Sequence, residues 1–118
     1  MATKLNDQAY DHARNLIRDG RWVLDQRDDW SEHRPTASQE NSYLEKHGWS
    51  DYQKWYLAID DDENEDTKAR FKFPYGDFGR IHRCAVISAE SRAGQYKHPD
   101  VEKAAQELLS MLNDVTVT

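Results

Sequence analysis

The sequence predicts an α+β fold in which about four helices pack on a small antiparallel β-hairpin or three-stranded sheet. Its 118 residues match the usual length of one domain, so we expect a single domain over residues 1–113 and a C-terminal tail over 114–118. Although 32% of the residues are charged, four Trp, six Tyr and three Phe supply large apolar side chains for a core. Apolar residues recur at helical spacing near both ends of the chain, and polar and apolar residues alternate in its middle. Together these two patterns predict a fold with both helices and strands.

The first helix is predicted from about Asn6 to Asp19, with Gly20 at the position where helices commonly end. Residues 22–24 are apolar and β-favouring, which indicates a brief third strand or an aromatic anchor across the core. The polar residues 25–35 predict a loop. The helix assignment depends on apolar residues that recur at steps of three and four: Leu5, Ala9, Ala13, Leu16 and Ile17.

A second helix is predicted after this loop. Thr36 and Gln39 have capping-box spacing, Ser38 is an alternative cap, and the helix is expected to end near His47, before Gly48.

A β-hairpin is predicted from residues 55–59 and 70–73. Helix is the rival interpretation of 55–59, but 70–73 alternate polar and aromatic residues and are stopped by Pro74, as in a half-buried strand. The acidic linker between the two segments predicts a solvated loop. It spaces oxygen donors as a calcium loop does, but Glu65 stands where that loop needs glycine and Phe71 where it needs glutamate.

Two further helices are predicted. One runs over 78–93, with Asp77 as its cap and Gly94 as its end, and the last runs from Pro99 to Asn113. Proline at the first turn favours a helix start, and the final helix carries the clearest amphipathic stripe in the chain. That stripe consists of Val101, Ala104, Ala105, Leu108, Leu109 and Leu112.

Charge is distributed unevenly along the chain. The net charge is −6, but residues 1–67 carry 8 basic and 16 acidic residues, whereas residues 68–98 carry 7 basic and only 2 acidic residues. The basic segment predicts either an anion-binding surface or internal pairing with the acidic first half. The negative total disfavours non-specific DNA binding.

His82 is the most informative candidate for a site, because on the predicted helix it lies on the buried face and needs a polar partner. Arg92 lies on the flank of that face, where an inward guanidinium needs a carboxylate from elsewhere in the fold. The alternatives are a satisfied core histidine with a structural salt bridge, or a site around His82 and Arg92. On a helix, Cys84 and His82 point about 200° apart, which excludes a nucleophilic dyad.

No metal site or cofactor is predicted, since the five histidines and the single cysteine lack ligand spacing. The lone cysteine, the absence of an apolar leader and the absence of a long apolar run favour a cytoplasmic location without a membrane span. Seven aromatic residues around the hairpin are available either for base stacking or for the core, and we expect core for most: Trp49, Tyr52, Trp55, Tyr56, Phe71, Phe73 and Tyr75.

The block over residues 72–78, together with His82-Arg83 and residues 90–96, resembles a family of short uncharacterised bacterial proteins known only as hypothetical. The resemblance extends to residues 28–31 and 47–49. It implies no activity and no catalytic residues. A vaguer similarity, in the order of a strand, a Tyr/Phe-Pro turn and a helix, is to small modules attached to phage head-maturation proteins.

The leading functional prediction is a non-enzymatic interaction or accessory module that binds an unknown protein partner. Its contact surface is expected on the side of Arg80, Arg83 and Lys97 or on exposed hairpin aromatics. The alternatives are nucleic-acid or polyanion binding through residues 68–98 and an enzyme with a site near His82 and Arg92. The predicted binding residues are Arg80, His82, Arg83, Arg92, Lys97 and Tyr75.

Overall fold

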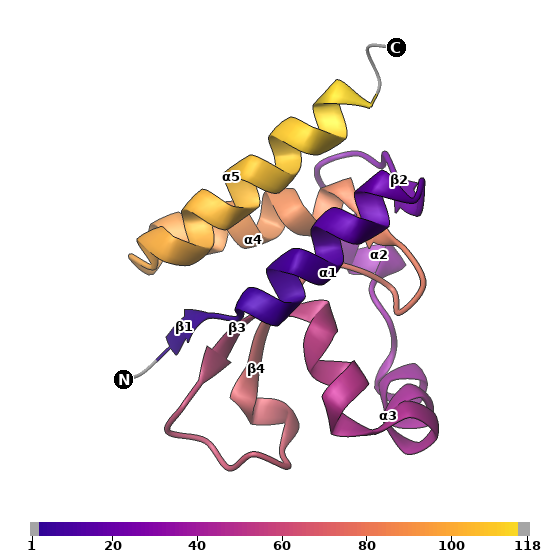
Figure 1. The fold of residues 1–118 in the computed structure, drawn as a ribbon, viewed down its shortest axis with the longest axis vertical. Helices are drawn as coiled ribbons and strands as arrows, with labels where there is room; N and C mark the ends of the chain where they lie inside the picture. The colour runs from indigo at the N-terminus through magenta and orange to yellow at the C-terminus, as the bar shows by residue number, and fades with distance from the viewer. Residues whose placement is uncertain (1–2, 116–118) are drawn as a thin grey trace.

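A computed structural model describes residues 3–115, and within them five α-helices pack around two small sheets, which confirms the α+β class (Figure 1). The helices are α1 (Asp7–Arg18), α2 (Trp30–His33), α3 (Ala37–Tyr52), α4 (Arg83–Gln95) and α5 (Pro99–Asp114). The strands are β1 (Thr3–Leu5), β2 (Trp22–Val23), β3 (Tyr56–Asp60), β4 (Phe71–Pro74) and β5 (Ile81–His82). Two 3₁₀ helices, η1 (Gln53–Trp55) and η2 (Lys68–Arg70), precede β3 and β4.

The larger sheet has the strand order β1-β3-β4, and both pairings are antiparallel. The predicted hairpin is therefore confirmed as β3 and β4. The third strand is β1, however, and the expectation that residues 22–24 join this sheet is wrong. The buried Asn6 explains the place of β1, because its side-chain amide donates to the carbonyl oxygens of Gln53 at 2.9 Å and Tyr56 at 3.1 Å.

Residues 22–23 form β2, which pairs in parallel with β5 in a second sheet. The prediction of a helix over 78–93 is wrong at its beginning, because α4 starts only at Arg83. Asp77 accepts from the backbone amides of Gly79 at 2.9 Å and Arg80 at 2.7 Å, which closes a local turn. Phe78 in this turn has a φ of 69°, which a helix does not allow. The chain then enters β5 before it becomes helical.

The second predicted helix is confirmed as α3, with the Thr36–Gln39 capping box at its start. Gly48 interrupts its regular dihedral angles with a φ of 80°, and one further turn follows. Residues 25–35 were expected to form a loop, but they contain α2, whose Trp30 is buried. Burial of that indole provides apolar stabilisation for a helix too short to form alone.

The core lies between the larger sheet and the helices α1, α4 and α5. Figure 1 shows α4 and α5 side by side, with α1 below them in this view. Five of the seven aromatic residues around the hairpin are buried, which confirms the prediction of a core role for most of them. The largest fully buried side chains include Tyr52, Leu57, Tyr75, Ile81, Leu108 and Leu112.

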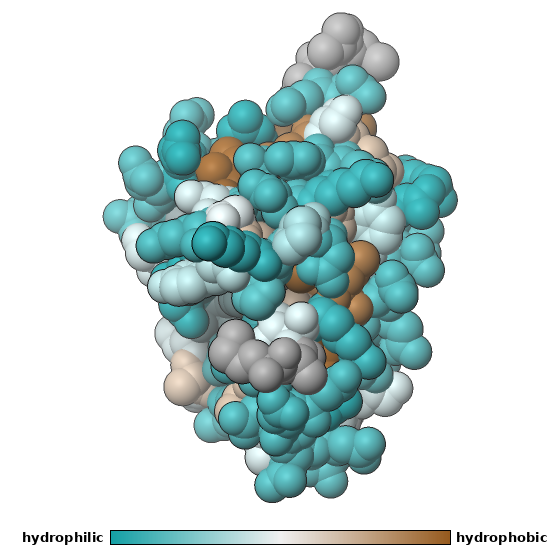
Figure 2. All heavy atoms as spheres, turned by 90° about the vertical axis from the view of Figure 1, so that its left-hand side faces the viewer, coloured by the Kyte–Doolittle hydropathy of each residue, from teal (hydrophilic) through white to brown (hydrophobic). Residues whose placement is uncertain are grey.

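Figure 2 shows one face of the molecule, which is largely hydrophilic. Apolar side chains on this face form small, separated areas among polar groups. Residues 61–66 of the acidic loop are exposed, as predicted. Within the described range, no helix is both long and apolar enough to cross a membrane.

Candidate metal centre

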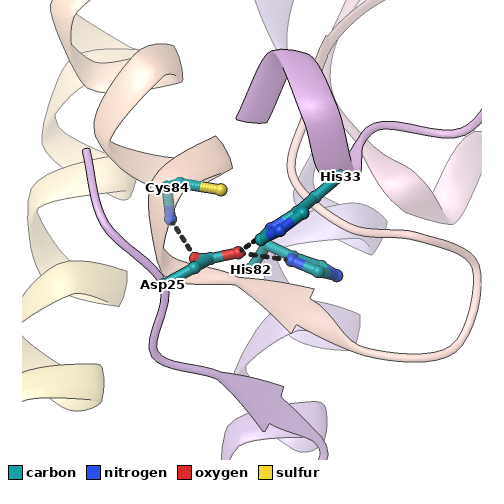
Figure 3. A group of neighbouring side chains, drawn as sticks. All are labelled: Asp25, His33, His82 and Cys84. Carbon is teal, nitrogen blue, oxygen red and sulfur yellow. Dashed lines mark hydrogen bonds and ion pairs between the residues drawn. The ribbon is translucent and has the colours of Figure 1, made fainter. Parts of the chain in front are cut away.

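Four side chains with metal-binding donor atoms gather where β2, α2, β5 and α4 meet: Asp25, His33, His82 and Cys84 (Figure 3). Asp25 follows β2 in the chain, His33 ends α2, His82 ends β5, and Cys84 lies in the first turn of α4. The parallel pairing of Val23 with His82 sets these distant segments side by side. The cluster is therefore a product of the small second sheet.

Asp25 is the centre of the cluster. Its Oδ2 lies 2.8 Å from His33 Nδ1 and 2.7 Å from His82 Nδ1, and its Oδ1 accepts from the Cys84 backbone amide at 2.7 Å. One donor atom from each of the four residues lies within 4.8 Å of the other three. Asp25, His82 and Cys84 are buried, whereas His33 is exposed at the edge. The four donors thus form a buried cluster with one open side.

Asp77 supports His82 from the opposite side of the imidazole ring. Its Oδ2 lies 2.7 Å from His82 Nε2, while its Oδ1 is held by the amides of the turn described above. The ring also lies beside Trp30, with centroids 5.6 Å apart. A carboxylate on the outer nitrogen of an imidazole is the usual way in which a metal-binding histidine is oriented.

The two carboxylates favour a charged His82. Burial alone lowers the pKa of an imidazole, but the hydrogen bonds with Asp77 and Asp25 outweigh it and raise the pKa of His82 above its ordinary value. Burial likewise acts to raise the pKa of Asp25, but hydrogen bonds from Cys84, His82 and His33 hold it well below its ordinary range. In the metal-free cluster, these contacts therefore favour an imidazolium at His82 paired with the Asp25 and Asp77 carboxylates.

Cys84 is an unreactive thiol in this environment. Burial, followed by the hydrogen bond and negative charge of Asp25, raises the pKa of Cys84 well above its ordinary value. Because the thiolate is the nucleophilic form of cysteine, a protonated buried thiol is a poor nucleophile. A metal ion bound in the cluster would lower the pKa of Cys84 instead, because a cysteine that binds a metal does so as the thiolate.

The ion pair predicts a pH-dependent stabilisation of the metal-free protein. Since folding raises the pKa of His82, its contribution is complete below the ordinary value of 6.5 and is lost as pH rises through the folded-state value. Urea unfolding of wild type and H82Q in EDTA should therefore give a difference in unfolding free energy that shrinks from pH 6 to pH 9. Histidines outside the cluster, His12, His47 and His98, cancel in this comparison. A difference that grows over this range would contradict the assignment.

A groove of about 1020 Å³ borders the cluster at His33 and Asp77. Its basic lining residues are Arg21, Lys46 and Arg80, and Asp77 is the acidic residue among those lining it. The groove therefore offers an anionic ligand or partner a positively charged surface beside the exposed edge of the cluster.

The structure separates most of the residues predicted to bind. His82 is buried with polar partners, as expected, and Arg80 lines the groove. Tyr75 is fully buried, and its hydroxyl donates to the Lys54 carbonyl at 2.6 Å. Arg83 and Lys97 lie near opposite ends of α4, and Arg92 lies on its exposed surface, where it lines other cavities.

Part of the basic segment 68–98 pairs with acidic residues of this chain. Two of its residues pair with the acidic first half of the chain, Lys68 with Glu40 at 3.3 Å and Arg70 with Asp61 at 3.6 Å. Both pairs involve acids before residue 68, which supports the internal-pairing alternative for this part of the segment.

Sequence reasoning did not find Asp25, His33, Cys84 or Asp77 as site residues. Their spacing matches no ligand motif, and the argument that separated Cys84 from His82 assumed a helix where the structure has β5. The available indication was the predicted burial of His82, which required a polar partner for its imidazole. Comparison with family models, curated proteins and solved structures found no match. The functional assignment therefore depends on the geometry of the cluster.

Proposed function

We propose that the protein is a small accessory module that binds a zinc-class divalent ion through Asp25, His33, His82 and Cys84. The convergence of four donor atoms within 4.8 Å of one another, from four separate segments, carries this proposal. Thiolate and imidazole ligands favour Zn²⁺ over Mg²⁺ or Ca²⁺, which prefer oxygen alone. A set of four protein ligands is typical of structural zinc sites, which agrees with a non-enzymatic role.

Metal binding requires only small movements of the donors. Tetrahedral Zn²⁺ with bonds of about 2.0–2.3 Å separates its ligand atoms by roughly 3.3–3.8 Å. The Asp25–histidine contacts, now 2.7 and 2.8 Å, must widen, and the most distant donors must approach. Each imidazole then presents Nδ1 to the ion, and His82 keeps its Nε2 proton on Asp77.

The ion would fix α2 against α4 and so define the wall of the adjoining groove. His33 ends α2 and also lines the groove, whereas Cys84 and His82 are buried. We assign partner binding to this groove, and its basic lining favours an acidic segment of a partner protein.

Calorimetric titration of EDTA-stripped protein with Zn²⁺ tests the proposal through His33. Because this side chain is exposed, H33A should fold normally yet lose one ligand. Even supporting residues of metal sites contribute about 10–100-fold to affinity, so we expect H33A to weaken Zn²⁺ binding by about 100-fold or more. Wild type should bind one ion per chain.

H47A is the matched control, because His47 is also exposed and lines the same groove but lies outside the cluster. Its affinity for Zn²⁺ should equal that of wild type. Equal weakening in H33A and H47A, or the absence of binding to wild type, would contradict the proposed metal centre.

A further inference from the structure

Three arginines line one cavity of about 480 Å³ between the α2 region, the end of β4 and α4: Arg27, Arg34 and Arg92. Asp28 is the acidic residue among those lining it, which leaves the wall with two net positive charges at neutral pH. Ser31 and Ser88 add hydroxyl groups, and Phe73 and Trp30 add aromatic surface. The cavity therefore combines a cationic wall with an apolar one.

The three guanidinium groups have no partner among the residues that the structure describes. Within residues 3–115, none of them makes a side-chain hydrogen bond or ion pair, whereas Arg14 pairs with Asp11 and Arg70 with Asp61. Acidic residues are not scarce, since the chain contains 22. All three arginines are exposed, so water screens their mutual repulsion, and their unpaired guanidinium groups are available to an anion.

A second observation comes from Phe73, which has a φ of 61° although it is neither glycine nor asparagine. Such strained residues gather at ligand-binding sites, where the surrounding structure holds them in place. Phe73 and Arg92 also line a neighbouring cavity of about 310 Å³, together with Tyr96 and His98. Tyr96 is the most exposed large apolar side chain in the described range, at 62%. The two cavities thus meet at a strained aromatic residue and an unpaired arginine.

We propose that these two cavities bind a small phosphomonoester that carries an aromatic group. The phosphate would lie among Arg27, Arg34 and Arg92, since guanidinium groups bind phosphate oxygens in a bidentate manner. A phosphomonoester carries nearly two negative charges at neutral pH, which matches the charge of the arginine cavity. The aromatic group would pack on Phe73 and Tyr96 in the neighbouring cavity. This site shares no lining residue with the four metal-binding donors, although α2 and α4 contribute to both.

Calorimetry with phenyl phosphate, inorganic phosphate and phenol, in EDTA, tests both parts of the site. EDTA removes any signal from phosphate bound to a metal ion. Phenyl phosphate should bind more tightly than inorganic phosphate, and phenol should not bind. R27Q, R34Q and R92Q should each weaken phenyl phosphate binding by about 10- to 100-fold, the usual effect of losing a hydrogen bond to a charged group.

R80Q is the matched control, because Arg80 is an exposed arginine that lines the other groove. It should bind phenyl phosphate as wild type does, and unchanged melting temperatures of all four variants would show that folding is intact. Equal weakening by R80Q, or no binding to wild type at millimolar concentration, would overturn the proposal. Equal affinities for inorganic phosphate and phenyl phosphate would also overturn it. A single-stranded oligonucleotide is a further probe. If it binds more tightly than phenyl phosphate, and R27Q, R34Q and R92Q weaken its binding, the ligand is a polyanion and the proposed small phosphomonoester is wrong.

Discussion

Asp25→Ala is expected to lower the melting temperature of the metal-free protein by about 10 °C or more. Asp25 is only 8% exposed and contacts His33, His82 and the Cys84 amide, so its removal leaves a buried imidazolium and a backbone amide without one of their partners. Removing one member of a buried ion pair costs about 3 kcal/mol or more. For a domain of this size, that cost corresponds to roughly 10 °C.

Asp28→Ala is the control for this substitution, because Asp28 lies in the same segment but is exposed. It should change the melting temperature by no more than about 2 °C, as surface substitutions usually do. Calorimetric or circular-dichroism melts of both variants in EDTA make the comparison. Similar melting temperatures for D25A and D28A would contradict the central position of Asp25.

Gly76→Ala is expected to destabilise the fold because the backbone approaches Trp55 closely at this turn. A Cβ on Gly76 would lie 2.6 Å from the Arg80 carbonyl oxygen and 2.6 Å from a ring carbon of Trp55. The first contact is backbone and the indole is 4% exposed, so neither group moves easily. Overpacking of this kind costs about 1–3 kcal/mol. Urea unfolding measures this loss.

The same substitution should also weaken Zn²⁺ binding, because the turn holds Asp77 against His82. Gly79→Ala is the matched control in the same turn, where a Cβ would meet only Asp77 Oδ1, at 3.4 Å. We expect G79A to unfold at nearly the wild-type urea concentration. If G76A and G79A are equally stable, the close packing described for the turn is wrong.

The sequence predicts those elements whose stability is local. The Thr36–Gln39 capping box, Pro99 at the start of α5 and the apolar stripe of α5 depend on residues within a few positions of one another. The β3–β4 hairpin also follows from a local alternation. The structure confirms each of these features. At these positions, contacts with distant parts of the chain do not override the local pattern.

The elements around the candidate site depend on distant contacts, and the sequence alone does not predict them. Residues 81–82 are strand because they pair with β2, almost sixty positions earlier. Phe78 has a φ of 69°, and this left-handed residue stops the predicted helix from starting after Asp77. The four metal-binding donors meet only once these two features are in place. The buried, partnered position of His82 was predicted, although from the face of a helix that the structure replaces by β5.

Cobalt substitution tests the metal centre most directly, because Cys84 is the single cysteine of the chain. A thiolate bound to Co²⁺ gives a sulfur-to-cobalt charge-transfer absorption, and tetrahedral Co²⁺ gives intense visible bands. Wild-type protein should show both features at one equivalent of Co²⁺. C84S should lose the charge-transfer band, and H47A should keep it. Weak octahedral bands alone in wild type, without sulfur-to-cobalt absorption, would contradict a centre formed by Asp25, His33, His82 and Cys84.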